Sequence, residues 1–163
     1  MTKARRTDPK KQPGLIVEQV FLVSAEFGHR ADYLQLPPTT RVDDVSTVIE
    51  TAVISSEDGR GAGIKVVART DASNPKAAVP LYNFRVEMAA LVRSIDGEEN
   101  MPPLDFVAGS GMATLLPFLR EAVANLTMRG RFGPIWLKPV NIRMSVEDIR
   151  KRIEAAADKK LKR

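Results

Sequence analysis

The hydrophobic periodicity of this chain changes once, near residue 95, and that change constrains the fold more than any other feature. Before it, apolar residues recur at every second position, and after it they recur at intervals of three and four. A period of two is typical of strands with one buried face, whereas the longer period is typical of amphipathic helices. Strands first and helices afterwards predict an α+β fold.

Four segments carry the period of two. In the first, the odd-numbered apolar residues share one face of the predicted strand: Leu15, Val17, Phe21, Val23, Ala25 and Phe27. The others are residues 45–55, residues 64–70 and residues 82–92, separated by polar segments that contain glycine or proline. Successive strands of this kind predict a four-stranded antiparallel sheet with one face covered.

The next segment has helical spacing. Its apolar positions follow the i, i+3, i+4 pattern: Leu115, Phe118, Leu119, Ala122, Val123 and Leu126. Because proline is tolerated best in the first turn of a helix, Pro117 predicts a start between Ala113 and Leu116. Arg129 and Gly130 are typical of a helix end.

A second helix is predicted from Ser145, where Asp148 completes a sequence that resembles a capping box. Between the two helices lies RGRFGPIWLKPVNI, residues 129–142, which we call the crossover segment. It is apolar, yet Pro134 and Pro139 disfavour both helix and sheet there. We therefore expect an irregular segment with an unusual need for burial.

Charge is concentrated at the two ends of the chain. The net charge is +5 over 163 residues, but residues 1–14 and 143–163 each carry +4 while residues 15–142 carry −3. Nucleic-acid-binding folds present a basic patch on the folded surface, so we expect no nucleic-acid partner. We predict a disordered basic arm (1–13), a single domain (14–157) and a basic tail (158–163).

No residues form a recognisable catalytic or metal-binding pattern. Cysteine is absent, and the single histidine, His29, has no second histidine to complete a metal site. The adjacent Asp43 and Asp44 point to opposite faces if they lie in a strand. The glycine-rich DGRGAG (58–63) lacks the lysine of a P-loop and indicates a hairpin turn. We therefore expect no enzyme activity, no cofactor and no metal.

The N-terminus lacks the apolar region of a signal peptide. No apolar run approaches the about 20 residues that cross a bilayer. The lack of cysteine also fits a reducing compartment. These features predict a cytoplasmic protein without membrane insertion.

Two interpretations of the crossover segment remain open. In the first, it folds back on the core of its own chain, since tryptophan and phenylalanine are usually buried. Alternatively, one helix already covers the sheet, and the apolar crossover side chains are buried by another subunit, by a bound polypeptide, or by both. The second interpretation rests on the cost of exposure, about 1.5–3 kcal/mol for each large apolar side chain.

Residues 115–142 resemble the most distinctive segment of the SecB family of protein-export chaperones. In that family an apolar-aromatic-proline helix start and Ala-Arg-Glu lead to Arg-Gly, then to an aromatic, proline, leucines and Pro-Val-Asn. The matching residues here are Leu116-Pro117-Phe118, Arg120-Glu121, Arg129-Gly130, Phe132, Pro134, Leu137 and Pro139-Val140-Asn141. Gly133 departs from the pattern because it separates the aromatic residue from the proline.

The resemblance implies a SecB-like fold: a four-stranded antiparallel sheet, a long helix, a crossover loop and a C-terminal helix. It implies a homo-oligomer, a dimer of dimers whose interface includes the helix residues Leu115, Phe118, Leu119, Ala122, Val123 and Leu126. It also implies a groove for unfolded client polypeptides, lined or supported by Phe132, Pro134, Ile135, Trp136, Leu137, Val140 and Ile142. An adaptable apolar surface suits clients that share no sequence.

The resemblance leaves the biological role open. SecB proteins pass clients to the SecA motor through an acidic sheet surface, whereas the body of this chain carries only −3. Some SecB-like proteins instead serve the antitoxin of a toxin–antitoxin pair. A further alternative is a scaffold protein whose apolar segment only stabilises an oligomer.

Overall fold

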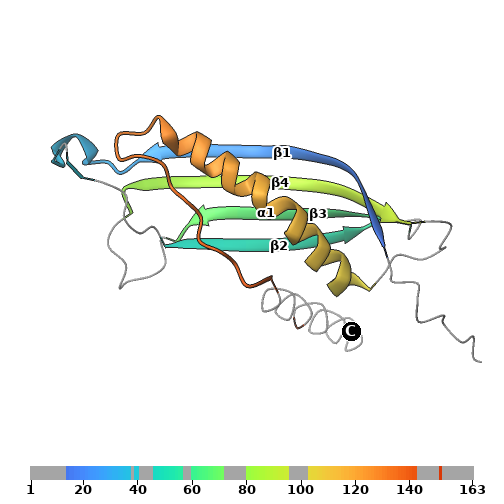
Figure 1. Ribbon diagram of the computed structural model, residues 1–163. Coiled ribbons are helices and arrows are strands. Elements are labelled where there is room, and N and C mark those ends of the chain that lie inside the picture. Colours follow the sequence, from blue (N-terminus) through green and yellow to red (C-terminus); the bar gives the residue numbers. More distant parts are fainter. Residues whose placement is uncertain are drawn as a thin grey trace, which may run out of the picture.

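The computed structural model describes residues 14–37, 39–40, 46–56, 60–71, 80–95, 103–142 and 151. Its elements are β1 (Leu15–His29), the 3-10 helix η1 (Tyr33–Gln35), β2 (Thr47–Ser55), β3 (Gly61–Thr70), β4 (Tyr82–Ser94) and α1 (Leu104–Met128). The strands form one antiparallel sheet in the order β1-β4-β3-β2 (Figure 1).

The predicted α+β class and four-stranded antiparallel sheet are confirmed. The helix predicted from Ser145 falls outside the described residues, apart from Lys151, and so do the N-terminal arm and the C-terminal tail. In the part of the chain that the structure describes, no helix is long and apolar enough to cross a membrane.

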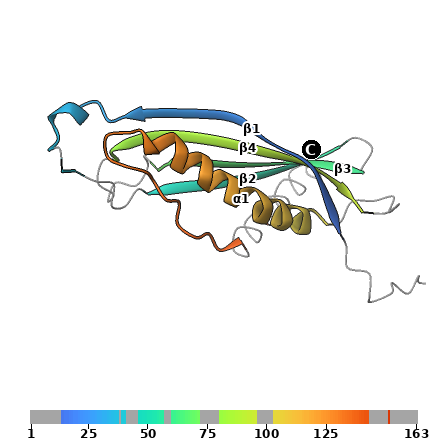
Figure 2. The same ribbon diagram turned by 45° about the horizontal axis from the view of Figure 1, so that its top comes forward.

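α1 crosses one face of the sheet diagonally, and the crossover segment runs beside it over the same face (Figures 1 and 2). A helix is about 10–12 Å wide, whereas four strands spaced by about 4.8 Å form a broader surface. The helix therefore leaves corners of the sheet uncovered. The crossover segment fills one of them, since Phe132, Ile135 and Leu137 are buried in the same core as α1 and the inner sheet face.

This packing corrects one interpretation of the sequence. We argued that a single helix covers the sheet, so that the apolar crossover residues need another chain for burial. That argument is wrong for Phe132, Ile135 and Leu137, which their own chain buries.

β1 contains two irregularities that the alternating pattern does not reveal. Its pairing with β4 shifts around Glu18 and again around Val23, so that one extra residue is inserted at each point. An extra residue in a strand reverses which residues face the core. Phe21 consequently lies on the face opposite α1, and Leu22 lies on the α1 face. The prediction that the odd-numbered apolar residues share one face is therefore wrong in the middle of β1.

The β2–β3 hairpin is confirmed, but β3 begins at Gly61, three residues before the predicted strand. Ser56 closes the hairpin, because its backbone N–H donates to the Gly61 carbonyl at 2.9 Å and its hydroxyl accepts the Gly61 N–H at 2.9 Å. The glycines at the end of DGRGAG thus belong to a strand.

α1 begins at Leu104, about ten residues before the predicted start, and Pro117 lies inside it. A proline in a helix interior leaves the carbonyl four residues earlier without its partner, at a cost of about 3 kcal/mol. Both Pro117 and Ala113 are exposed, so water can satisfy that carbonyl. The opposite side of the helix is buried on the sheet. There Gly111 allows close contact, since a Cβ at this position would lie 2.3 Å from Cδ1 of Ile64.

Candidate functional site

The first half of the crossover segment, residues 129–135, is fixed by buried hydrogen bonds, and we call it the anchored half. The Phe132 N–H donates to the Tyr82 hydroxyl at 2.7 Å, and the Ile135 N–H donates to the Thr127 hydroxyl at 2.8 Å. The Thr127 hydroxyl in turn donates to the Val123 carbonyl at 2.8 Å. Two buried hydroxyls, one from β4 and one from α1, therefore determine the path of the chain.

Aromatic rings from four parts of the chain meet at the start of the anchored half. Tyr82 lies 5.5 Å from Phe132 and 5.1 Å from Phe27, and His29 stacks on Tyr33 at 4.7 Å, measured between ring centroids. We call these five residues the aromatic cluster. It joins the end of β1, η1, the start of β4 and the crossover segment.

Tyr82 is central to this cluster. Burial raises the pKa of its phenol, partly opposed by the Phe132 and Gly133 N–H groups, which favour the ionised oxygen. The phenol is therefore neutral at physiological pH. Space at this point is tight, because a Cβ on Gly130 would lie 2.4 Å from the Tyr82 hydroxyl oxygen. The glycine predicted as a helix end is thus also required for contact with the ring.

The second half of the segment, residues 136–142, contains the outward-facing Trp136, and we call it the outer half. The Arg120 guanidinium on α1 donates to its Lys138 carbonyl at 3.2 Å. Trp136 projects outward and is 72% exposed, although its neighbours Ile135 and Leu137 are buried. An exposed tryptophan between two buried aliphatic residues is unusual, since isolated chains normally bury such a ring.

The seven residues predicted to form a groove therefore divide into three groups. Trp136 is exposed; Pro134, Val140 and Ile142 are half-buried; Phe132, Ile135 and Leu137 are buried. Only the first two groups present surface to a ligand in this conformation. Their assignment to client binding stays a prediction.

The six predicted interface residues on α1 divide similarly. Leu115, Leu119 and Val123 are fully buried against the sheet, whereas Ala122 and Leu126 are partly buried. Phe118 is 47% exposed and points away from that core. Of this set, Phe118 offers the most surface to another subunit, and its role there stays a prediction.

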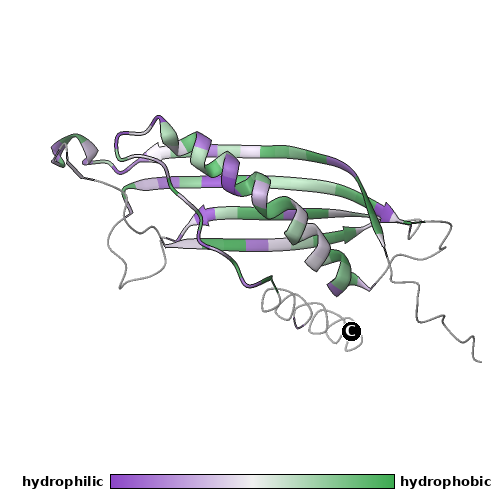
Figure 3. Cartoon of the chain, viewed as in Figure 1, coloured by the Kyte–Doolittle hydropathy of each residue, from purple (hydrophilic) through white to green (hydrophobic). Residues whose placement is uncertain are grey.

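The N-terminal half of β1 adds apolar surface on the same side. α1 does not cover this part of the sheet, and Figure 3 shows apolar residues along it. Val17 and Leu22 face the α1 side there and remain exposed. Large exposed apolar surfaces on soluble proteins mark sites of interaction.

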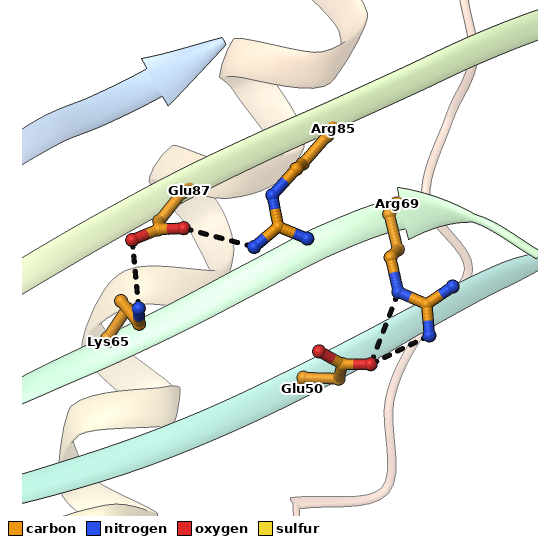
Figure 4. Close-up of polar contacts among 5 residues, drawn as sticks. All are labelled: Glu50, Lys65, Arg69, Arg85 and Glu87. Carbon is orange, nitrogen blue, oxygen red and sulfur yellow. Dashed lines mark hydrogen bonds and ion pairs between the residues drawn. The ribbon is translucent and has the colours of Figure 1, made fainter. Parts of the chain in front are cut away.

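The opposite face of the sheet has a different chemistry. Glu87 pairs with Lys65 at 3.0 Å and with Arg85 at 3.3 Å, and Glu50 pairs with Arg69 at 2.8 Å (Figure 4). The hydrogen bond from Lys65 is the main reason why the pKa of the Glu87 carboxyl lies below its ordinary value. The charges on this face compensate one another across neighbouring strands.

The sequence interpretation missed three residues that position the crossover segment: His29, Tyr82 and Thr127. In the sequence His29 has no partner for a metal site, Tyr82 begins the apolar face of the strand predicted over residues 82–92, and Thr127 lies within the predicted helix. Thr127 follows the helical apolar spacing from Val123, which was a signal that its side chain faces inward. No local pattern links Tyr82 to a segment 50 residues away.

No protein-family model matches the chain. A curated relative, the protein-export protein SecB of Nitrosomonas eutropha, is 25% identical over 142 residues, covering 83% of this chain and 82% of the relative.

Among solved structures, a Mycobacterium tuberculosis SecB-like chaperone in complex with a ChAD peptide from the HigA1 antitoxin has a TM-score of 0.52. It is 16% identical, and the match covers 78% of this chain and 88% of that one. The likeness to this solved structure shows a shared fold. The sequence match to SecB and the shared fold agree with the resemblance that residues 115–142 carry. The chain is thus similar to SecB in sequence and shares its fold with a SecB-like chaperone.

Proposed function

We propose that this protein is a non-enzymatic molecular chaperone that binds non-native polypeptides through the outer half of its crossover segment. The main support is Trp136, a large aromatic side chain held outward on a segment whose neighbouring residues are anchored in the core. An anchored base and an adaptable apolar edge suit a ligand that is recognised by its exposed apolar side chains rather than by one sequence.

A matched pair of substitutions tests this proposal. Trp136→Ala removes the outward ring, and Ile54→Ala removes a comparably exposed apolar side chain from edge strand β2 (72% and 69% exposed). We expect the unmodified protein to suppress aggregation of a denatured model protein, Trp136→Ala to lose most of that activity, and Ile54→Ala to retain it. Equal activity in all three proteins would contradict a role for the crossover segment.

The protein is also proposed to act as an oligomer, with a dimer of dimers as the expected form. Phe118 on α1, together with Val17 and Leu22 on β1, leaves apolar surface on the α1 side of the protomer. A second copy of the chain would cover this surface. Phe118→Glu should reduce the mass measured by light scattering, whereas a monomeric parent protein would refute the proposal.

Two cellular roles fit such a chaperone: general export or service to one dedicated client. The compensated outer sheet face favours the dedicated client, because Glu18, Glu50 and Glu87 are each paired with a basic side chain. An acidic docking surface for an export motor needs uncompensated carboxylates. The structural neighbour that is bound to an antitoxin peptide adds support for this role.

Identification of co-purified polypeptides by mass spectrometry separates the two roles. A dedicated chaperone should yield one dominant client, and an export chaperone should yield many precursors with signal peptides. A scaffold protein should yield no client and should leave Trp136 fluorescence unchanged when denatured protein is added.

A further inference from the structure

His29 connects the start of the crossover segment to the end of β1. Its Nε2 atom accepts a hydrogen bond from the backbone N–H of Arg131 at 3.4 Å. The ring is held by the rest of the aromatic cluster, with Tyr33 stacked on it at an interplanar angle of 28° and Phe27, Tyr82 and Phe132 at its edges. His29 is thus positioned to fix the point at which the chain leaves α1 and returns over the sheet.

The other contacts that fix the anchored half have a different chemistry. The Tyr82 and Thr127 hydroxyls accept backbone N–H groups, and the Arg131 guanidinium donates to the Leu36 carbonyl at 2.8 Å. Hydroxyl and carbonyl oxygens keep their charge state between pH 5 and 8, the range in which histidine side chains ordinarily gain a proton. A protonated imidazole carries N–H on both nitrogens and accepts no hydrogen bond. Among these contacts, the one between His29 and Arg131 is therefore the one that a proton on the acceptor would break.

The surroundings of His29 decide which element moves. On the crossover segment, the Arg131 backbone N–H points at Nε2, and an added N–H on Nε2 would place two donors against each other. Tyr33, in η1, presents a ring face that attracts a cation. In the adjoining turn Arg30 and Asp32 pair with each other, and the buried Tyr82 phenol stays neutral. A protonated His29 would therefore keep its stacking on Tyr33 and lose its contact with the crossover segment.

We propose that His29 is a positioning residue whose protonation loosens residues 130–133 and so makes the presentation of Trp136 dependent on pH. The consequence for client uptake rests on the proposed function. The loosening itself does not, because it is measured on the protein without a client.

Amide hydrogen exchange read by mass spectrometry at pH 7.5 and pH 5.5, corrected for intrinsic exchange rates, tests this proposal. Peptides that cover residues 129–137 should lose protection about three- to ten-fold at pH 5.5, the effect of one backbone hydrogen bond. Peptides from the N-terminal part of α1 should keep their protection, which shows that the fold is intact.

Two variants separate the titration from the packing. His29→Gln keeps an acceptor that does not titrate, so its protection should be the same at both pH values. His29→Phe keeps an aromatic ring without an acceptor, so its protection should be low at both. A parent protein that responds to pH no more than His29→Gln would overturn the proposal.

Hydrogen exchange and the aggregation assay together distinguish the positioning role of His29 from the proposed chaperone function. If protection falls at pH 5.5 but aggregation is suppressed at neither pH, the positioning role of His29 stands and the proposed chaperone function fails. If aggregation is suppressed while protection does not respond to pH, the reverse holds.

Discussion

The two halves of the crossover segment each contain a proline and large apolar residues, but they have different structural roles. The anchored half places Phe132 and Ile135 in the core and ties their backbone N–H groups to buried hydroxyls. The outer half places Trp136 outside, and the Arg120 guanidinium donates to its Lys138 carbonyl. The buried hydroxyls therefore determine which residues of the segment are fixed in the core and which one is presented outward. The following substitutions test this division.

The largest loss of stability is expected from Phe132→Ala in the anchored half. Phe132 is 1% exposed, and truncation of a buried phenylalanine lowers the free energy of unfolding by about 3–5 kcal/mol. Chemical denaturation at fixed protein concentration measures this change. Phe132→Leu, which retains most of the volume, should lose less. A loss below about 1 kcal/mol for Phe132→Ala would remove the distinction between the two halves.

Thr127→Val should have the next largest effect. The side-chain volume is kept, but the buried Ile135 N–H loses its acceptor, which costs about 1–3 kcal/mol. Thr127→Ser retains the hydroxyl and serves as the control. If thermal denaturation gives the same midpoint for valine and serine, the hydroxyl does not anchor the segment.

A smaller effect is expected from Gly133→Ala. Gly133 has φ = 90°, and a Cβ there would meet no atom within 4 Å, so that only backbone strain is introduced. Strain of this kind costs about 1–2 kcal/mol. Gly133→Asn should lose less, because asparagine tolerates positive φ better. An unchanged unfolding midpoint for Gly133→Ala would indicate that the turn adapts.

The smallest change in stability is expected from Trp136→Ala in the outer half. Its ring is mostly exposed, so the free energy of unfolding should change by no more than about 0.5 kcal/mol. Denaturation curves and the aggregation assay should therefore give opposite rankings for Phe132 and Trp136. A large loss of stability in Trp136→Ala would place this ring among the structural residues.

Much of the fold could be predicted because its strongest patterns are local. In β4, every even-numbered residue from Tyr82 to Val92 is apolar, and the structure buries this predicted face. In β1 the adjacent Phe21, Leu22 and Val23 are all apolar, so the sequence does not show where an extra residue reverses the faces. The start of α1 was misplaced because the proline rule takes no account of a solvent-exposed carbonyl at Ala113.

The division within the site could not be predicted for a related reason. Ile135, Trp136 and Leu137 are consecutive apolar residues, and nothing in their order indicates that the largest one faces outward. The orientation depends on hydroxyls that lie 8 residues from Ile135 and 50 residues from Phe132 in the sequence. Such contacts become visible only in three dimensions.

The two irregularities in β1 also affect how relatives of this protein can be aligned. A relative that lacks the extra residue at Glu18 or Val23 would present the opposite set of side chains beyond that point, although its strand pairs with the same neighbour. A gapless alignment of β1 would then match inward residues of one protein with outward residues of the other. Sequence identity along β1 consequently understates structural equivalence, and gaps placed at these two residues are the appropriate correction.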